Sequence, residues 1–158
     1  MSSNEEIVRD LLAADSTLVS LLTGGFYAYS DTTRSGFSRI VTPQAYNQNV
    51  GTQQAGNLKP LVVVKERAMT PRQGITDEST GYITTQQVIE LWFYEDGDSG
   101  YSIIEQARDR AFSLLNNVPA SQGFQYMWSQ DVNNLRDTEL NEASLIRSDY
   151  RFIGYKSA

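Results

Sequence analysis

The chain has 158 residues, with 13 basic and 19 acidic side chains, a formal net charge of −6, and neither cysteine nor histidine. This length fits one domain, and 40% hydrophobic with 11% aromatic residues is typical of a folded protein. The composition excludes disulfides, cysteine nucleophiles, thiolate zinc sites, imidazole metal sites and Ser-His-Asp triads. We therefore expect a single domain over residues 1–158 that is not an enzyme and uses no metal and no cofactor.

The charge and hydropathy patterns also argue against nucleic-acid and membrane binding. No segment is strongly basic, so a phosphate-binding surface is not expected. The longest apolar runs, such as Leu61–Val64, are far shorter than the ~20 residues of a membrane helix. The first residues lack the basic and apolar regions of a secretory signal. We expect a soluble chain that is not exported.

Two helices are predicted at the start of the chain. Ser3 and Glu6 have the spacing of a capping box, and apolar residues follow at helical intervals. Asp15 or Ser16 can cap a second, short helix. Gly24-Gly25 ends it, because glycine adopts the left-handed conformation at low cost.

A polar stretch and a hairpin are predicted in the middle of the chain. Phe26–Tyr29 predicts a short strand, and residues 30–60 predict a long polar loop, which is uncommon inside a domain and indicates function or disorder. Leu61–Met69 predicts a strand. Residues 70–81 are rich in turn formers and predict a hairpin connection, so that residues 70–87 project as an arm.

The second half begins with the clearest strand, Tyr82–Glu95, whose two faces both become apolar only from Val88 onward. That half of the strand is predicted to be buried on both sides. Asp98 or Ser99 is predicted to cap a helix that runs to about Asn116.

Two closing strands, Phe124–Val132 and Ser144–Tyr155, complete the pattern. The order is helix, helix, hairpin, helix, hairpin. It predicts an α+β fold, with an antiparallel or mixed sheet of four to five strands and helices packed on one side.

The acidic turn Glu95–Asp98 is the best candidate for a metal site. A calcium loop starting at Asp96 would need an oxygen ligand at its fifth position and glutamate at its twelfth. Those positions hold Gly100 and Ala107, so the spacing fails. The turn is predicted to be a solvated helix cap.

Paired carboxylates are the second chemical candidate. Glu66 and Glu90 could face each other across a hairpin, as the two acids of a glycoside hydrolase do across a cleft. Lys65 and Arg67 flank one of them, which favours a surface charge ladder instead. Neither pattern predicts catalysis.

Aromatic residues are more numerous than one small core easily absorbs. Tyrosine and tryptophan suit protein interfaces, because they offer a large area, few rotatable bonds and one polar group. They equally suit the rim of an ordinary sheet, and both interpretations stay open. The interface candidates of this kind are Tyr27, Tyr29, Tyr82 and Trp128.

Three stretches and their order resemble the tail terminator proteins of long-tailed bacteriophages, also called tail completion or head–tail joining proteins. The stretches are Glu6–Leu22, with its Leu11-Leu12 pair, then Lys59–Val64, and Gln87–Tyr94, which leads through an acidic glycine turn into a helix. The resemblance covers most of the chain. It rests on element order and hydrophobicity rather than on a catalytic motif.

The resemblance implies a structural role in the virion, assembled in the host cytoplasm. Such proteins form a ring, typically of six subunits, that stops polymerisation of the tail tube and presents the docking surface for the head. The implied partners are like copies, the tail tube protein and the head–tail connector or head-closure protein, with DNA only as passing cargo. Within the arm, Arg72, Asp77 and Glu78 would set the register of contacts by charge. Glu66 and Glu90 are candidate acids facing the channel, where they would repel phosphate.

Two other classes of function remain open. One is another structural component of a phage neck or tail, such as a head-closure or tail tube protein. The other is a bacterial enzyme or adaptor unrelated to phage. A tube subunit should polymerise without limit, whereas a terminator should stop at a ring.

Overall fold

The computed structural model describes residues 4–29, 46–50, 53–67, 70–77, 82–116, 126–137 and 143–157. In chain order the described elements are α1 (Asn4–Ala13), α2 (Ser16–Leu21), β1 (Gly25–Ala28), β2 (Tyr46–Val50), β3 (Gln53–Leu58), β4 (Leu61–Glu66), β5 (Thr70–Asp77), β6 (Tyr82–Glu95), the 3-10 turn η4 (Gly97–Ser99), α3 (Ser102–Leu115), β7 (Met127–Asp137) and β8 (Ala143–Ser157). This composition confirms the predicted α+β fold.

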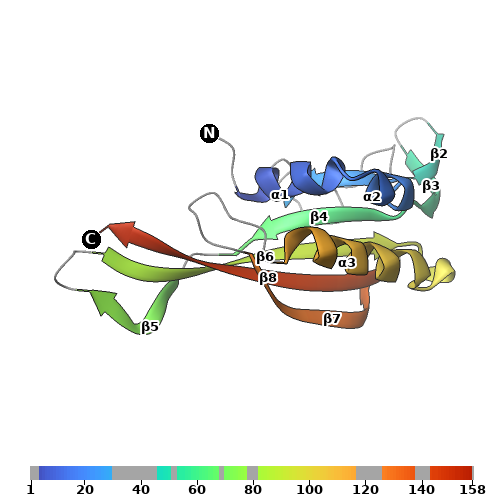
Figure 1. Cartoon of the computed structure of the whole chain (residues 1–158). Coiled ribbons are helices and arrows are strands. Elements are labelled where there is room, and N and C mark those ends of the chain that lie inside the picture. Colours follow the sequence, from blue (N-terminus) through green and yellow to red (C-terminus); the bar gives the residue numbers. More distant parts are fainter. Residues whose placement is uncertain are drawn as a thin grey trace.

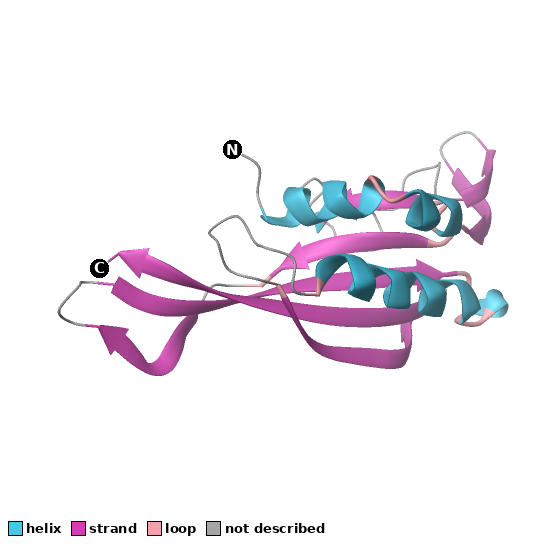
Figure 2. Ribbon diagram, in the orientation of Figure 1, coloured by secondary structure: helices cyan, strands magenta, loops and turns pink. Residues whose placement is uncertain are grey.

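The main sheet is mixed, with its strands in the order β1-β4-β6-β8-β7, and β5 adds to it by pairing with β6. β1 runs parallel to β4, and the other pairings are antiparallel. The described helices lie over one face of this sheet, as predicted (Figures 1 and 2). β2 and β3 form a separate two-stranded sheet. The main sheet has six described strands rather than four to five, because β5 joins it.

The N-terminal helices form largely as the sequence predicts. The backbone N–H of Leu18 donates to the Asp15 carboxylate at 3.0 Å, so Asp15 is the N-cap of α2. Ser3, the other predicted cap, lies outside the described residues. The N–H of Gly24 donates to the carbonyl of Pro60 at 2.8 Å, and Gly25 has φ of +113°. This glycine turn directs the chain into β1, beside β4.

The main core lies between the helices and the covered face of the sheet. Leu12 and Leu18 from the helices are fully buried in the same cluster as Ile89, Leu91 and Phe93 of β6. The remaining buried members of this core are Val8, Leu22, Val62, Val64, Ile104, Ala107, Ala111, Leu115, Tyr126, Ile146, Tyr150 and Phe152. Burial of this apolar face accounts for the 3.6-residue and two-residue periodicities of the sequence.

The opposite face of the sheet carries a second, smaller apolar cluster at one end. Its buried members are Leu58, Leu61, Val63, Tyr94, Ala143 and Leu145. On this face of β6, Glu90 and Tyr94 are buried, whereas Val88 and Trp92 are partly exposed. The predicted burial of β6 on two sides from Val88 onward therefore holds in part.

Two predicted loops contain strands and need correction. Within the predicted loop 30–60, Tyr46–Val50 pairs with Gln53–Leu58, while residues 30–45 lie outside the described part. Within the predicted turn 70–81, Thr70–Asp77 pairs with β6. Both segments are polar. Pairing of main-chain groups does not need an apolar pattern, so composition alone did not reveal these strands.

The start of α3 also differs from the prediction. Asp96, not Asp98, caps the short 3-10 turn, and Gly100, with φ of +78°, separates this turn from α3. The helix begins at Ser102 instead of after Asp98 or Ser99. Its N-terminal turn is satisfied by Glu95 of β6, whose carboxylate accepts from the N–H of Ile104 at 3.3 Å. Glu95 is 2% exposed, and this burial raises its pKa.

Candidate interaction surface

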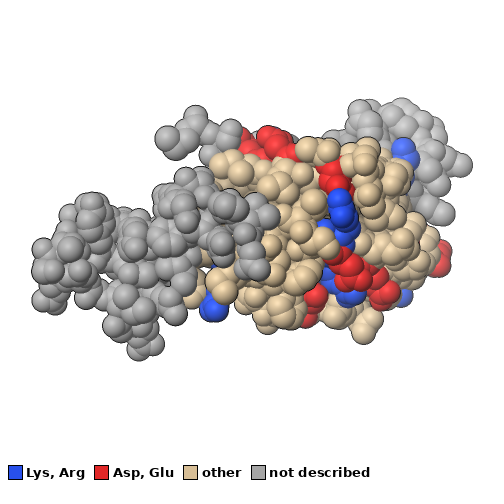
Figure 3. Space-filling model, viewed as in Figure 1, with Lys and Arg blue, Asp and Glu red and all other residues tan. Residues whose placement is uncertain are grey.

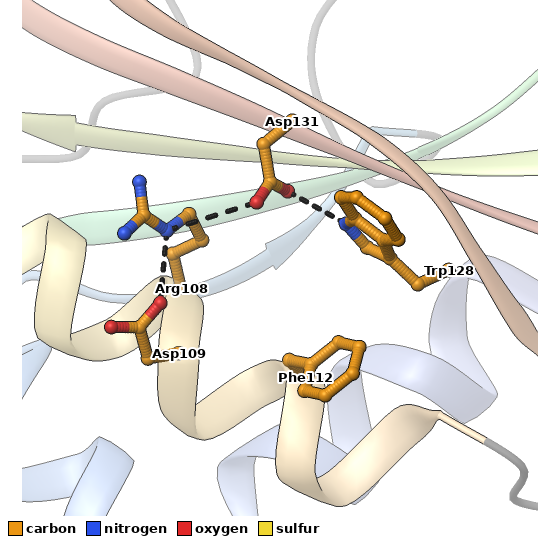
Figure 4. A pocket seen from close by; sticks show the side chains of 5 residues that line it. All are labelled: Arg108, Asp109, Phe112, Trp128 and Asp131. Atoms are coloured by element: carbon orange, nitrogen blue, oxygen red, sulfur yellow. Dashed lines mark hydrogen bonds and ion pairs between the residues drawn. The ribbon is translucent and has the colours of Figure 1, made fainter.

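A groove of about 350 Å³ lies between α3 and β7 (Figure 4). It is lined by Arg108, Asp109, Phe112, Trp128 and Asp131, and we call it the aromatic groove. Phe112 belongs to α3 and Trp128 to β7, and their rings meet edge to face at 86°, with centroids 6.2 Å apart. The groove therefore has an aromatic wall contributed by two elements that are separated in the sequence.

Polar contacts hold the wall of the groove in place. The indole Nε1 of Trp128 donates to the Asp131 carboxylate at 3.0 Å, and the Ser148 hydroxyl donates to the same oxygen at 2.7 Å. On the helix, Arg108 pairs with Asp109 at 3.1 Å and lies 3.9 Å from Asp131. Trp128 is thus positioned by hydrogen bonding rather than left free to rotate.

The groove is exposed in the single chain. Phe112 is 42% exposed and Trp128 is 44% exposed, and the neighbouring Met127 is 42% exposed. On the helix side of the molecule, acidic and basic side chains lie next to one another across the middle of the described surface, and a separate acidic group lies along the upper margin (Figure 3). An exposed aromatic cluster with a rigid polar rim is typical of a protein-binding surface.

A cluster of matched charges lies on the sheet face away from the helices. Asp149 is 1% exposed and accepts hydrogen bonds from Arg67 at 2.8 Å and from Gln130 at 2.7 Å. Arg147 reaches Asp149 at 3.1 Å and Glu90 at 3.4 Å, and Arg67 reaches Glu90 at 3.3 Å. We call these five residues the ion cluster. Its two acids are buried, and both face two guanidinium groups.

The two predicted channel acids have different surroundings. Glu90 is 5% exposed inside the ion cluster, where arginines match its charge. Glu66 is partly exposed and accepts from the side-chain amide of Asn4 at 3.2 Å and from the amide of Gln87. Burial raises the pKa of Tyr126, and the nearby Glu66 carboxylate adds to this shift. The structure does not bring Glu66 and Glu90 together as a catalytic pair.

The predicted arm takes the form of a long ribbon. β6 and β8 pair along Tyr82–Glu95 and Ser144–Ser157, and β5 pairs with the first residues of β6. The ribbon extends beyond the helices in Figure 1. Arg72 and Asp77 lie on β5, and Asp77 pairs in register with Tyr82. Their side chains and the whole of Glu78 lie outside the described part of the structure.

The remaining predicted interface aromatics differ in exposure. Tyr27 is partly buried, and its hydroxyl donates to the carbonyl of Gly24 at 2.6 Å. Tyr29 is partly buried under the Lys65 ammonium, 5.0 Å from the ring centroid. Of the three described side chains, Trp128 is the exposed one. Sequence reasoning missed Phe112, although its place off the buried stripe of α3 was a usable signal.

Among the described residues, no cluster of three or more acidic side chains is arranged to hold a metal ion. The predicted acidic turn instead caps the 3-10 helix through Asp96. The described helices also contain no segment with the length and hydropathy required to cross a membrane.

Comparison with known proteins identifies a likeness of fold. No protein-family model matches the sequence, and no curated protein matches it either. Among solved structures, the fold resembles a chain in the virion of a native gene transfer agent (GTA) particle, with a TM-score of 0.52 and 12% identity. The similarity covers 94% of this chain and 92% of that chain. The chain therefore shares the α+β fold of a virion component along nearly its whole length.

Proposed function

We propose that this chain is a structural virion protein that acts as a tail terminator. In this role it forms a ring, of six subunits, on the end of the completed tail tube. The ring stops tube polymerisation and provides the surface on which the filled head docks. The protein acts by binding its partners, without catalysis, in the virion tail or neck after assembly in the host cytoplasm.

The observation that carries this proposal is the likeness of fold to a virion chain over almost the full length of both chains. The family resemblance of the sequence supports the finer role at the tail end. Neither argument depends on an active site, and the exposed side chains of the aromatic groove suit a binding protein.

The proposed partners are further copies of the chain, the tail tube protein and the connector or head-closure protein. A ring needs two different surfaces that meet head to tail through a rotation that closes. The ribbon of β5, β6 and β8 offers a surface for the tube or for a neighbouring subunit. DNA would pass through the bore, and acidic side chains facing it, for which Glu66 is the partly exposed candidate, would oppose phosphate binding there.

The experiment is deletion of the gene from the parent genome, followed by electron microscopy of the particles. We expect overlong tails without heads, and restoration of normal particles when the intact gene is supplied in trans. Normal tails carrying heads would contradict any assembly role. A double deletion with the tail tube gene should remove the overlong tails, which confirms that they are polymerised tube.

A second candidate is another neck or tail component, either a head-closure or a tail tube protein. It is favoured by the same likeness, because a virion neighbour alone does not specify the position within the particle. The deletion phenotype separates the candidates. Loss of a head-closure protein should give finished tails beside heads that leak DNA, and loss of a tube protein should give no tails.

A further inference from the structure

The exposed apolar side chains of the described residues occur in two places. Phe112 and Trp128 line the aromatic groove, with Met127 next to Trp128 in β7, and Val19 stands alone on α2, 49% exposed. In Figure 1, α1 and α2 lie at the β1 margin of the sheet, whereas β7 forms the opposite margin. The molecule thus has a large aromatic surface at one margin and a small aliphatic one towards the other.

The segment of the chain that carries Val19 has little charge. Between Leu11 and Tyr29 the sequence has one charged residue, Asp15. That carboxylate is matched by Arg110, which donates to it at 2.7 and 3.1 Å. The residues exposed beside Val19 are small or carry hydroxyl groups, and they are Ala13, Ala14, Ser16, Thr17, Ser20 and Thr23. A small surface depleted of charge matches the centre of a protein interface.

Charge at the two margins is complementary. The aromatic groove has an excess of acid, because Asp109 and Asp131 face the single guanidinium of Arg108. Asp109 is 73% exposed. At the other margin, the partly exposed Lys59 packs against Gly24, at the turn that follows α2. A lysine at the turn that follows α2 on one copy and the exposed Asp109 of the aromatic groove on another carry opposite charges and would attract each other.

We propose that the aromatic groove binds α2 of a second copy of this chain, with Val19 inserted against Phe112 and Trp128 and Lys59 near Asp109. The two surfaces differ, so the contact is heterologous and propagates head to tail, as a ring requires. This inference rests on the proposed function and assigns the interface through which its ring closes. It makes Phe112 and Trp128 interface residues.

Thiol cross-linking can test this pairing directly, because the chain has no cysteine of its own. Ser20→Cys places a thiol beside Val19, and Ser113→Cys places one beside Phe112; both positions are exposed. Both changes are nearly isosteric and leave the apolar side chains intact. The two variants are mixed at high protein concentration with a short bifunctional thiol reagent, and dimers are separated by denaturing electrophoresis.

We expect cross-linked dimers in the mixture and at least tenfold fewer in either variant alone, since a heterologous contact never joins two identical positions. Ser102→Cys is the matched control for Ser113→Cys. It is exposed on the same helix, about 16 Å away along the axis, and should cross-link poorly with Ser20→Cys. Val19→Asp introduced into the Ser20→Cys variant should reduce the dimer yield at least tenfold while leaving the melting temperature unchanged.

Three outcomes overturn the inference. Efficient dimers from Ser113→Cys alone would indicate a two-fold contact through the groove. Wild-type rings seen by electron microscopy, without cross-links in the mixture, would exclude this interface and leave the proposed function intact. Wild-type protein that remains monomeric at every concentration, together with normal particles after gene deletion, would contradict both.

Discussion

On the face of the sheet covered by α1, α2 and α3, side chains are packed as an apolar core, whereas the opposite face combines a small apolar cluster with buried charges. Leu91 and Ile146 on the covered face are completely buried among other hydrocarbons. Glu90 and Asp149, on the same two strands, are almost as buried but face arginines. Two faces of one strand pair therefore achieve burial in different ways.

The burial of a side chain therefore does not by itself identify the interaction that stabilises it. The covered face gains free energy from removing apolar area from water. The ion cluster instead compensates two buried carboxylates, and its net contribution to folding is small compared with the cost of removing one member. The covered face provides the main core, while the ion cluster joins side chains of β6, β7 and β8 to Arg67, the residue that follows β4.

The largest effect should come from opening a cavity on the covered face. Leu91→Ala removes a fully buried side chain, and we expect the free energy of unfolding to fall by about 2–5 kcal/mol. Val88→Ala is the matched control on the other face of the same strand, where the side chain is partly exposed, and should cost about 1 kcal/mol. Urea unfolding followed by circular dichroism measures both. Equal losses would contradict the assigned difference between the faces.

Removing one acid from the ion cluster should have a smaller effect. Asp149→Ala leaves Arg67 and Arg147 with fewer acceptors, and we expect the free energy of unfolding to fall by about 2–3 kcal/mol. This loss is smaller than that for a fully buried ion pair, because the Arg67 side chain is 42% exposed. Asp109→Ala, at a 73% exposed acid, should change stability by less than about 0.5 kcal/mol. If the two variants unfolded at the same urea concentration, the ion cluster would not be part of the folded state.

Glu95 links β6 to α3. Its removal should lower the free energy of unfolding by less than removal of Asp149 does. Glu95→Ala deletes the acceptor for the N–H of Ile104, with an expected loss of about 1 kcal/mol, typical of a helix cap. Because burial raises the pKa of Glu95, the free energy of unfolding of the wild type should decrease as the pH rises from the usual glutamate pKa of 4.5 through the raised pKa.

Glu95→Gln removes this titration and serves as the control for the pH effect. Its stability relative to the wild type should increase as the pH rises through that range. Unfolding curves at several pH values between about 4 and 7 measure the difference. A difference in stability between Glu95→Gln and the wild type that stays constant with pH would contradict a raised pKa at Glu95.

The smallest effect should come from the pair between Asp15 and Arg110, which joins α2 to α3. The hydrogen bond from Arg110 lowers the pKa of Asp15, so its contribution is present above the usual value of 3.8 and is lost as the pH falls through the lowered pKa. Asp15→Asn keeps an N-cap residue but removes the charge. The variant should therefore be less stable than the wild type only at pH values above the pKa of Asp15. Asp10→Asn, at a 65% exposed acid, is the control. Melting temperatures against pH measure both.

Much of the fold could be predicted because local patterns and packing agree. The alternation that places Ile89, Leu91 and Phe93 on one face of β6 and the stripe from Ile104 to Leu115 on α3 correspond to faces that are buried in the structure. β2, β3 and β5 were missed because their side chains are polar and their pairing uses the main chain. The start of α3 was misplaced because its cap comes from Glu95, on the preceding strand, rather than from a residue of the turn.

The candidate site was predictable only in part. Trp128 was identified from its residue type, but its partner Phe112 comes from another element, and no local pattern indicates that the two rings meet. The ion cluster could not be predicted from the sequence either, because Arg67 and Asp149 are 82 positions apart. Contacts at such separations depend on strand order, which the sequence pattern leaves open.

The irregularity of β7 has a consequence for aggregation. β7 is an edge strand of 11 residues, and its register with β8 shifts twice, between Trp128 and Gln130 and between Val132 and Leu135, with Asn134 at φ of 60°. Such bulges spoil the flat row of amide and carbonyl groups that would recruit an intruding strand. The bulged edge of β7 is therefore a poor template for edge-to-edge pairing between free subunits.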